Sequence, residues 1–202
     1  MTKEASLTTL SYPVLLQYIT QKICHDLATP VGAIRLGLEH MEENEFTPLL
    51  MQSIDNATTR IDIFRTLFST SHNNIDTTRA GKLLQAYLKS KNIDFEDSGK
   101  TTPTGARLML GIGIVACEAL PRGGCIHVDF DKLSLVCEGP IVHFPYNYLN
   151  INSLLKENLN FKSGIIFFHV LYLAEIEKLA LESHQEAEAL LLHFKGKNQE
   201  IA

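Results

Sequence analysis

The sequence has few of the features that mark membrane, secreted or nucleic-acid-binding proteins. No apolar run reaches the roughly 18–20 residues that a membrane-spanning helix needs, and residues 1–6 lack the apolar core of a signal peptide. There are 18 lysines and arginines against 23 acidic residues, so the basic excess typical of duplex binding is missing. The four cysteines, without a secretion signal, predict reduced thiols. We therefore expect a cytoplasmic protein that binds neither membrane nor nucleic acid.

The first part of the chain carries two helical patterns, whose apolar residues recur at alternating steps of four and three, as in a coiled-coil seam. In the helix expected over residues 13–41 they are Leu27, Val31, Ile34, Leu38 and Met41. In the next helix, expected to start at Thr47-Pro48, they are Leu50, Ile54, Ala57, Ile61, Phe64 and Phe68. The short polar loop between the helices predicts an antiparallel hairpin. Its seam predicts a four-helix bundle built by a homodimer.

Beyond a polar segment at residues 71–78, interpreted as a linker, the periodicity changes. We expect helices over residues 79–91, 104–120 and 164–176, and strands over 93–95, 125–130, 133–137, 179–183 and 189–194. A Glu-rich helix remains an alternative for the last two strands. This order predicts an α/β sandwich with its helices on one face of a mixed sheet. The predicted fold class is α+β, with one domain over residues 1–72 and another over residues 73–202. A chain of 202 residues is long enough to form packed cores.

The segment 24–34 (CHDLATPVGAI) holds the residues best suited to chemistry. With the seam placed as above, His25 and Thr29 point to solvent on the same side of the helix, and Cys24 faces the seam, where we expect it to pack. An exposed neutral imidazole is a good nucleophile. Asp26 can orient one ring nitrogen and leave the other free to attack. Pro30 removes the helical hydrogen bond to the Asp26 carbonyl and bends the helix.

This segment resembles the H-box of bacterial sensor histidine kinases, His-Asp/Glu-Leu-x-x-Pro-Leu/Val-x-x-Ile, and more specifically the ChpT family of histidine phosphotransferases. Residues 32–34 (GAI), 37–39 (GLE) and 57–68 (ATTRIDIFRTLF) also look like that family, the last being similar to its Arg-x-x-Phe-Phe-Arg-x-x-Phe pattern. The resemblance implies that His25 is the phosphoacceptor. It also implies a kinase-like α/β domain, and partners that are receiver domains of response regulators and hybrid kinases, which supply the Mg²⁺.

The second domain resembles the ATP-binding domain of histidine kinases in element order but lacks three nucleotide-binding elements. Gly111 and Val115 stand where two asparagines are expected, and neither can ligate Mg²⁺ through a side chain. Glu138-Gly139 replaces the adenine-reading Asp-x-Gly. No glycine between Gly139 and Gly164 can hinge an ATP lid. We expect a degenerate ATPase-like domain with no bound cofactor and no autokinase activity.

The predicted function is therefore histidine phosphotransfer in a two-component phosphorelay. The catalytic residues are His25, Asp26 and Thr29, and Thr29 leaves a phosphatase role open. Gly32 and Leu36 fall on the solvent face beyond His25 and are predicted to contact the receiver. Two alternatives are an ATP-dependent kinase fragment and a non-catalytic receiver-binding adaptor. Cys125, His127, Cys137 and His143 form a weak metal candidate, for which ordinary packing is the preferred interpretation, so no metal is expected.

Overall fold

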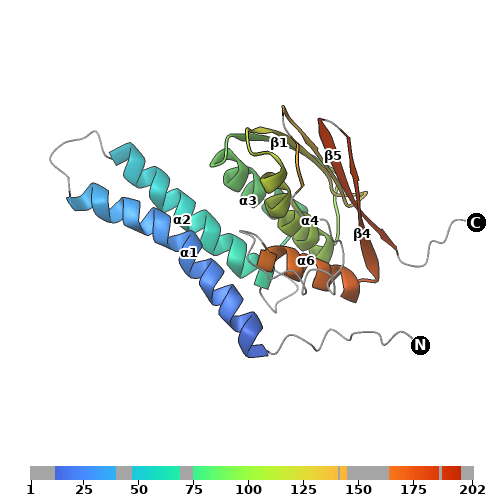
Figure 1. Cartoon of the computed structure of the whole chain (residues 1–202), viewed down its shortest axis with the longest axis horizontal. Helices are drawn as coiled ribbons and strands as arrows, with labels where there is room; N and C mark the ends of the chain where they lie inside the picture. The colour runs from blue at the N-terminus through green and yellow to red at the C-terminus, as the bar shows by residue number, and fades with distance from the viewer. Residues whose placement is uncertain are drawn as a thin grey trace, which may run out of the picture.

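A computed structural model describes residues 12–39, 47–68, 75–140, 142–144, 164–186 and 188–196. Two long helices lead into a layered α/β body (Figure 1). The elements are α1 (Tyr12–Glu39), α2 (Thr47–Phe68), α3 (Thr77–Lys89), β1 (Ile93–Ser98), α4 (Pro103–Ala116), the 3₁₀ turn η2 (Cys117–Ala119), β2 (Gly124–Asp129), β3 (Ser134–Glu138), α6 (Gly164–Ile176), β4 (Leu179–Gln185) and β5 (Ala189–Gly196).

Helices α1 and α2 form the expected hairpin and run side by side along most of their length (Figure 1). α2 begins at Thr47, as the Thr47-Pro48 pair predicts. Near the turn end the two helices approach so closely at Gly37 that a Cβ there would run into the Leu50 side chain. Gly37 is buried for this reason, and its missing side chain sets the helix spacing.

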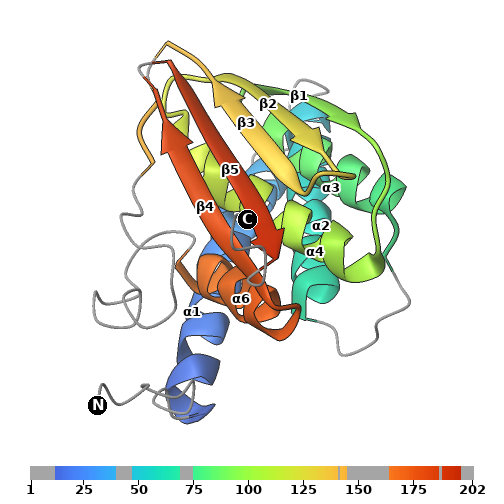
Figure 2. The same ribbon diagram turned by 90° about the vertical axis from the view of Figure 1, so that its right-hand side faces the viewer.

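The five strands form one mixed sheet in the order β1-β2-β3-β5-β4. β1 and β2 are parallel, and the remaining neighbours are antiparallel. Helices α3, α4 and α6 cover one face, and Figure 2 looks onto the other. The α+β fold class and the predicted element order are confirmed, including the closing β4–β5 hairpin, so the helical alternative for those residues was wrong.

The core of the α/β body is built around α4. Every residue from Gly105 to Ala116 is buried, because α4 packs against α3, α6 and the sheet. Glycines permit this close packing, since a Cβ at Gly111 would meet Val170 of α6 and one at Gly113 would meet Leu84 of α3. Apart from the buried Arg107, these residues are apolar or glycine on all sides of the helix, as expected for a helix in such a position.

The end of α2 joins this core. Ile63 and Leu67 are almost wholly buried and belong to the same cluster as the α4 residues. His169 of α6 lies 2.7 Å through Nε2 from the Leu67 carbonyl oxygen, and its ring packs on Phe68. The last turn of the hairpin is therefore part of the α/β body. The predicted domain boundary between residues 72 and 73 lies outside the described residues.

Some predicted boundaries need correction. The linker expected over residues 71–78 is too long, because Ile75 is buried and α3 already starts at Thr77. The carboxylate of Asp76 caps that helix by accepting a hydrogen bond from the backbone N–H of Arg79. The helix expected over 104–120 ends as an α-helix at Ala116 and continues as the 3₁₀ turn η2. Within the described part of the chain, no helix combines the length and apolar character needed to cross a bilayer.

Candidate phosphotransfer site

His25 lies in the middle of α1 with its side chain 74% exposed, whereas the neighbouring Asp26 side chain is only 9% exposed. His25 Nδ1 is 3.1 Å from Asp26 Oδ1. An ionised carboxylate can only accept a hydrogen bond, so this contact favours the neutral tautomer with the proton on Nδ1. Nε2 then keeps its lone pair. The arrangement presents one oriented nucleophilic nitrogen on a rigid helix.

Arg60 reaches Asp26 across the hairpin from α2. Its Nη1 donates to the Asp26 backbone oxygen at 3.1 Å and lies 3.6 Å from Asp26 Oδ1. Sequence reasoning missed this residue. Two signals were available, since Pro30 leaves the Asp26 carbonyl without its helical donor, and Arg60 lies in the segment 57–68 that carries the family resemblance.

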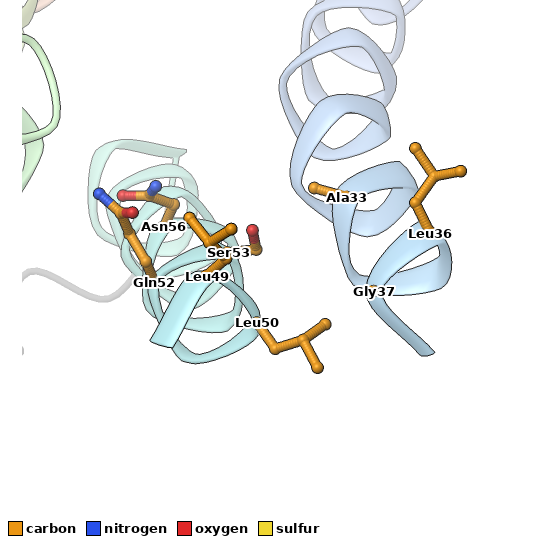
Figure 3. A pocket seen from close by; sticks show the side chains of 8 residues that line it. All are labelled: Ala33, Leu36, Gly37, Leu49, Leu50, Gln52, Ser53 and Asn56. Atoms are coloured by element: carbon orange, nitrogen blue, oxygen red, sulfur yellow. The ribbon is translucent and has the colours of Figure 1, made fainter. Parts of the chain in front are cut away.

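Thr29, Gly32 and Leu36 line the His25 side of α1. Thr29 is exposed one turn beyond His25, and a Cβ at Gly32 would have nothing within 4 Å. Leu36 is 53% exposed. It sits on the rim of a groove of about 440 Å³ between α1 and α2 (Figure 3). These residues therefore lie on one accessible surface, and Leu36 borders the groove.

The seam residues divide into two sets that the heptad pattern alone does not distinguish. One set is buried or half-buried within the chain: Leu27, Ile34, Leu50, Ala57, Phe64 and Phe68. The other set is exposed: Cys24, Val31, Ile54 and Ile61. Cys24 belongs to the second set, so its expected packing in the seam does not occur within one chain and stays a prediction for a bundle of two hairpins. The side chain of Leu38 and all of Met41 lie outside the described residues.

The α/β body contains the positions at which the sequence lacks the expected nucleotide-binding residues. Gly111 and Val115 are buried in α4 and present nothing to solvent. Glu138 is exposed at the end of β3, with Oε2 3.6 Å from His127 Nε2. A Cβ at Gly124 would collide with the Glu138 backbone oxygen, so the Gly123-Gly124 turn is packed tightly against β3. Most of the segment expected to form a lid, between Gly139 and Gly164, lies outside the described residues.

The weak metal candidate is not assembled. Cys137 is buried on the helix-covered side of the sheet, and burial raises the pKa of its thiol to about 12. His127 of β2 instead interacts with Glu96 and Glu138 on neighbouring strands. Among the residues that the structure describes, no group of three or more histidine, cysteine or acidic side chains is arranged to hold a metal ion.

Comparison with known proteins agrees with the resemblance drawn from the sequence. The chain is 26% identical over 200 residues to the protein phosphotransferase ChpT of Brucella abortus (strain 2308), covering 91% of this chain and 96% of that protein. Its fold matches the solved structure of a bacterial phosphotransferase with a TM-score of 0.76 and 24% identity, over 93% of this chain and 98% of the other. No protein-family model matches the chain. Over nearly its whole length, this chain is therefore similar in sequence to a ChpT phosphotransferase and in fold to a solved bacterial phosphotransferase.

Proposed function

We propose that this protein is a histidine phosphotransferase that carries a phosphoryl group between receiver domains of a cytoplasmic two-component phosphorelay. The observation that carries the proposal is the exposed imidazole of His25, oriented through Nδ1 by the buried Asp26 carboxylate. The phosphotransferase name of the Brucella relative supports it.

In the proposed step, the Nε2 lone pair of His25 attacks the phosphorus of an aspartyl phosphate on the donor receiver. The N–P bond forms as the P–O bond to the aspartate breaks, and the aspartate leaves as a carboxylate with the bonding electrons. The Asp26 carboxylate offsets the positive charge that develops on the imidazole. The reverse sequence at a second receiver returns the phosphoryl group to an aspartate. Receiver-bound Mg²⁺ supplies the remaining charge stabilisation, so this chain contributes mainly orientation.

The exposed seam supports a homodimer. Cys24 and Val31 of α1 and Ile54 and Ile61 of α2 are exposed seam residues, and we interpret them as one apolar stripe on the hairpin, while the other described seam residues are buried or half-buried. In a four-helix bundle each hairpin contributes such a stripe to the shared core. A second copy is the occupant that the heptad pattern fits, because a closed two-fold assembly pairs the same surface on both chains.

The receiver is proposed to dock on the His25 side of the hairpin. Gly32 leaves room for a close backbone approach, and Leu36 with the adjoining groove offers an apolar anchor point. Leu49 of α2 is also exposed and lines the same groove (Figure 3). Gly32 and Leu36 thus act in partner binding, and Thr29 lies exposed one turn beyond His25, where it can take part in the reaction.

The test is transfer of radiolabelled phosphoryl from a phosphorylated receiver to the purified protein. We expect label on the wild type, with the acid-labile and base-stable behaviour of phosphohistidine, and none on His25→Gln. Label that persists on folded His25→Gln would refute the assignment. Tight Mg·ATP binding by calorimetry would favour a kinase fragment, and receiver binding without any labelled protein would favour an adaptor.

A further inference from the structure

Pro30 removes one backbone hydrogen bond from the helix that carries His25. In a regular α-helix the N–H of residue 30 would donate to the carbonyl of Asp26, but proline has no N–H. A carbonyl without a partner is costly in a sheltered position. Here the Asp26 oxygen accepts a hydrogen bond from Arg60 Nη1 at 3.1 Å. The side chain of Arg60 replaces the donor that Pro30 removes.

The same guanidinium nitrogen also faces the Asp26 carboxylate, 3.6 Å from Oδ1. That Oδ1 is the atom that lies 3.1 Å from His25 Nδ1. The contacts therefore form a chain from α2 to the ring: Arg60 to Asp26, and Asp26 to His25. The side chains of Arg60 and Asp26 are only 21% and 9% exposed. Sheltered pairs are screened less by solvent and salt than the usual surface ion pair.

We infer that Arg60 is a positioning residue for phosphotransfer, which holds the backbone and the carboxylate of Asp26 together and thereby fixes the ring of His25. This inference rests on the proposed function of His25. A guanidinium suits the task because its planar group presents several donors in fixed directions, whereas a lysine offers one compact charge. Two anchor points on one residue restrict Asp26 more than either alone.

Helix α3 contributes Tyr87 to the electrostatic surroundings of this pair. Burial raises the pKa of the Tyr87 hydroxyl, the charge of Asp26 raises it further, and Arg60 acts in the opposite direction. Tyr87 thus lies within electrostatic reach of the Arg60–Asp26 pair. Helix α2, which carries Arg60, packs against α3, so the α/β body lies next to the hairpin at this level.

The direct test is the tautomer of neutral His25, measured by ¹⁵N NMR on the full chain. We expect the Nδ1–H form to dominate in the wild type. In Arg60→Gln the Nε2–H form should increase, because the carboxylate is free to turn away. Arg65→Gln is the matched control, since Arg65 lies on the same helix and pairs with Asp62 of that helix. An unchanged tautomer in folded Arg60→Gln would overturn the inference.

Transfer kinetics supply the second measurement. Arg60→Gln should slow transfer from a phosphorylated receiver by roughly tenfold or more, and Arg60→Lys should fall between it and the wild type. Because Arg60 acts through Asp26, the double variant Asp26→Asn/Arg60→Gln should be no slower than the slower single variant. Rate losses that multiply would overturn the inference.

Two further outcomes separate the proposals. If Arg60→Gln does not fold, Arg60→Lys replaces it in both measurements, with a smaller shift in the same direction, and no shift counts against the inference. A wild type that accepts no phosphoryl group, although its His25 tautomer depends on Arg60, would refute the proposed function. A wild type that transfers normally, with Arg60 variants unchanged in both measurements, would refute the role of Arg60 alone.

Discussion

The hairpin and the α/β body place their apolar residues differently. Among the side chains that the structure describes, nine large apolar residues are exposed, and six of them lie on α1 or α2: Val31, Leu36, Leu49, Met51, Ile54 and Ile61. The α/β body instead buries α4 from Gly105 to Ala116 between helices and sheet. The core of the body includes only the end of the hairpin, through Ile63 and Leu67, whereas the rest of the hairpin keeps exposed apolar side chains of the kind that mark interaction surfaces.

The largest expected effect concerns the buried core of the α/β body. Phe167 of α6 is fully buried and makes an edge-to-face contact with Phe144. Phe167→Ala should lower the free energy of unfolding by about 3–5 kcal/mol, through lost burial and a cavity that a packed core cannot refill. Chemical denaturation measures this. The control is Ile176→Ala on the same helix, where the side chain is 57% exposed and the change should stay within about 0.5 kcal/mol. Similar losses in both variants would contradict the model of the core.

The next effect concerns the dimer. Ile61 is exposed in one chain, whereas Phe64, one turn on, is buried. Ile61→Asp should weaken dimerisation by about 100-fold or more, roughly 2.7 kcal/mol, because it places a charge in the proposed bundle core. Its helix content should be kept. Phe64→Ala should instead destabilise the hairpin within each chain. Light scattering at micromolar concentration measures the mass, and a monomeric wild type would contradict the bundle.

These two variants also show where sequence reasoning reached its limit. Periodicity predicted the hairpin and located α6, because long amphipathic or apolar segments carry strong signals. The heptad pattern could not show that Ile61 faces outward and Phe64 inward, since both are seam positions. Which seam residues are buried within one chain depends on which helix, or which second subunit, packs against each side of α2. Nor could it predict the contact of Arg60 with Asp26, because the pairing of residues 34 positions apart follows from how two helices pack.

A third prediction concerns the junction between hairpin and body. Burial, and less strongly the charge of Arg107, lower the pKa of His169, while the hydrogen bond with the Leu67 carbonyl acts in the opposite direction. Because the folded pKa is below the ordinary value of about 6.5, the unfolded chain binds the proton first as the pH falls. The stability contribution is therefore complete above about pH 6.5 and is lost below it, by at most about 1.4 kcal/mol per pH unit.

Denaturation of the wild type and His169→Gln at pH 7 and pH 5 tests this sign. The variant should lose less stability between the two values, because its side chain does not titrate. Acid-sensitive carboxylates are common to both proteins and cancel in the difference. Equal losses of stability in the two proteins would show that protonation of His169 does not destabilise the junction.

A smaller effect is expected on the receiver side. Leu36→Glu should leave the fold and the dimer intact, because Leu36 is exposed and lies away from the stripe of Cys24 and Val31. It should weaken receiver binding and slow transfer about tenfold, equivalent to roughly 1.4 kcal/mol. Titration calorimetry with a receiver domain measures the affinity. Unchanged binding and kinetics in the folded variant would remove Leu36 from the docking surface and leave His25 unaffected.

The smallest effect distinguishes stability from function at Gly32. A glycine inside a helix costs up to about 1 kcal/mol relative to alanine, and a Cβ at this position would meet nothing within 4 Å. Gly32→Ala should therefore raise the free energy of unfolding by up to about 1 kcal/mol. If Gly32 is present to let the receiver backbone approach His25, the same variant should transfer more slowly despite being more stable. Denaturation and transfer assays on one preparation give both values. A more stable variant with wild-type transfer would show that the hairpin tolerates this glycine without using it.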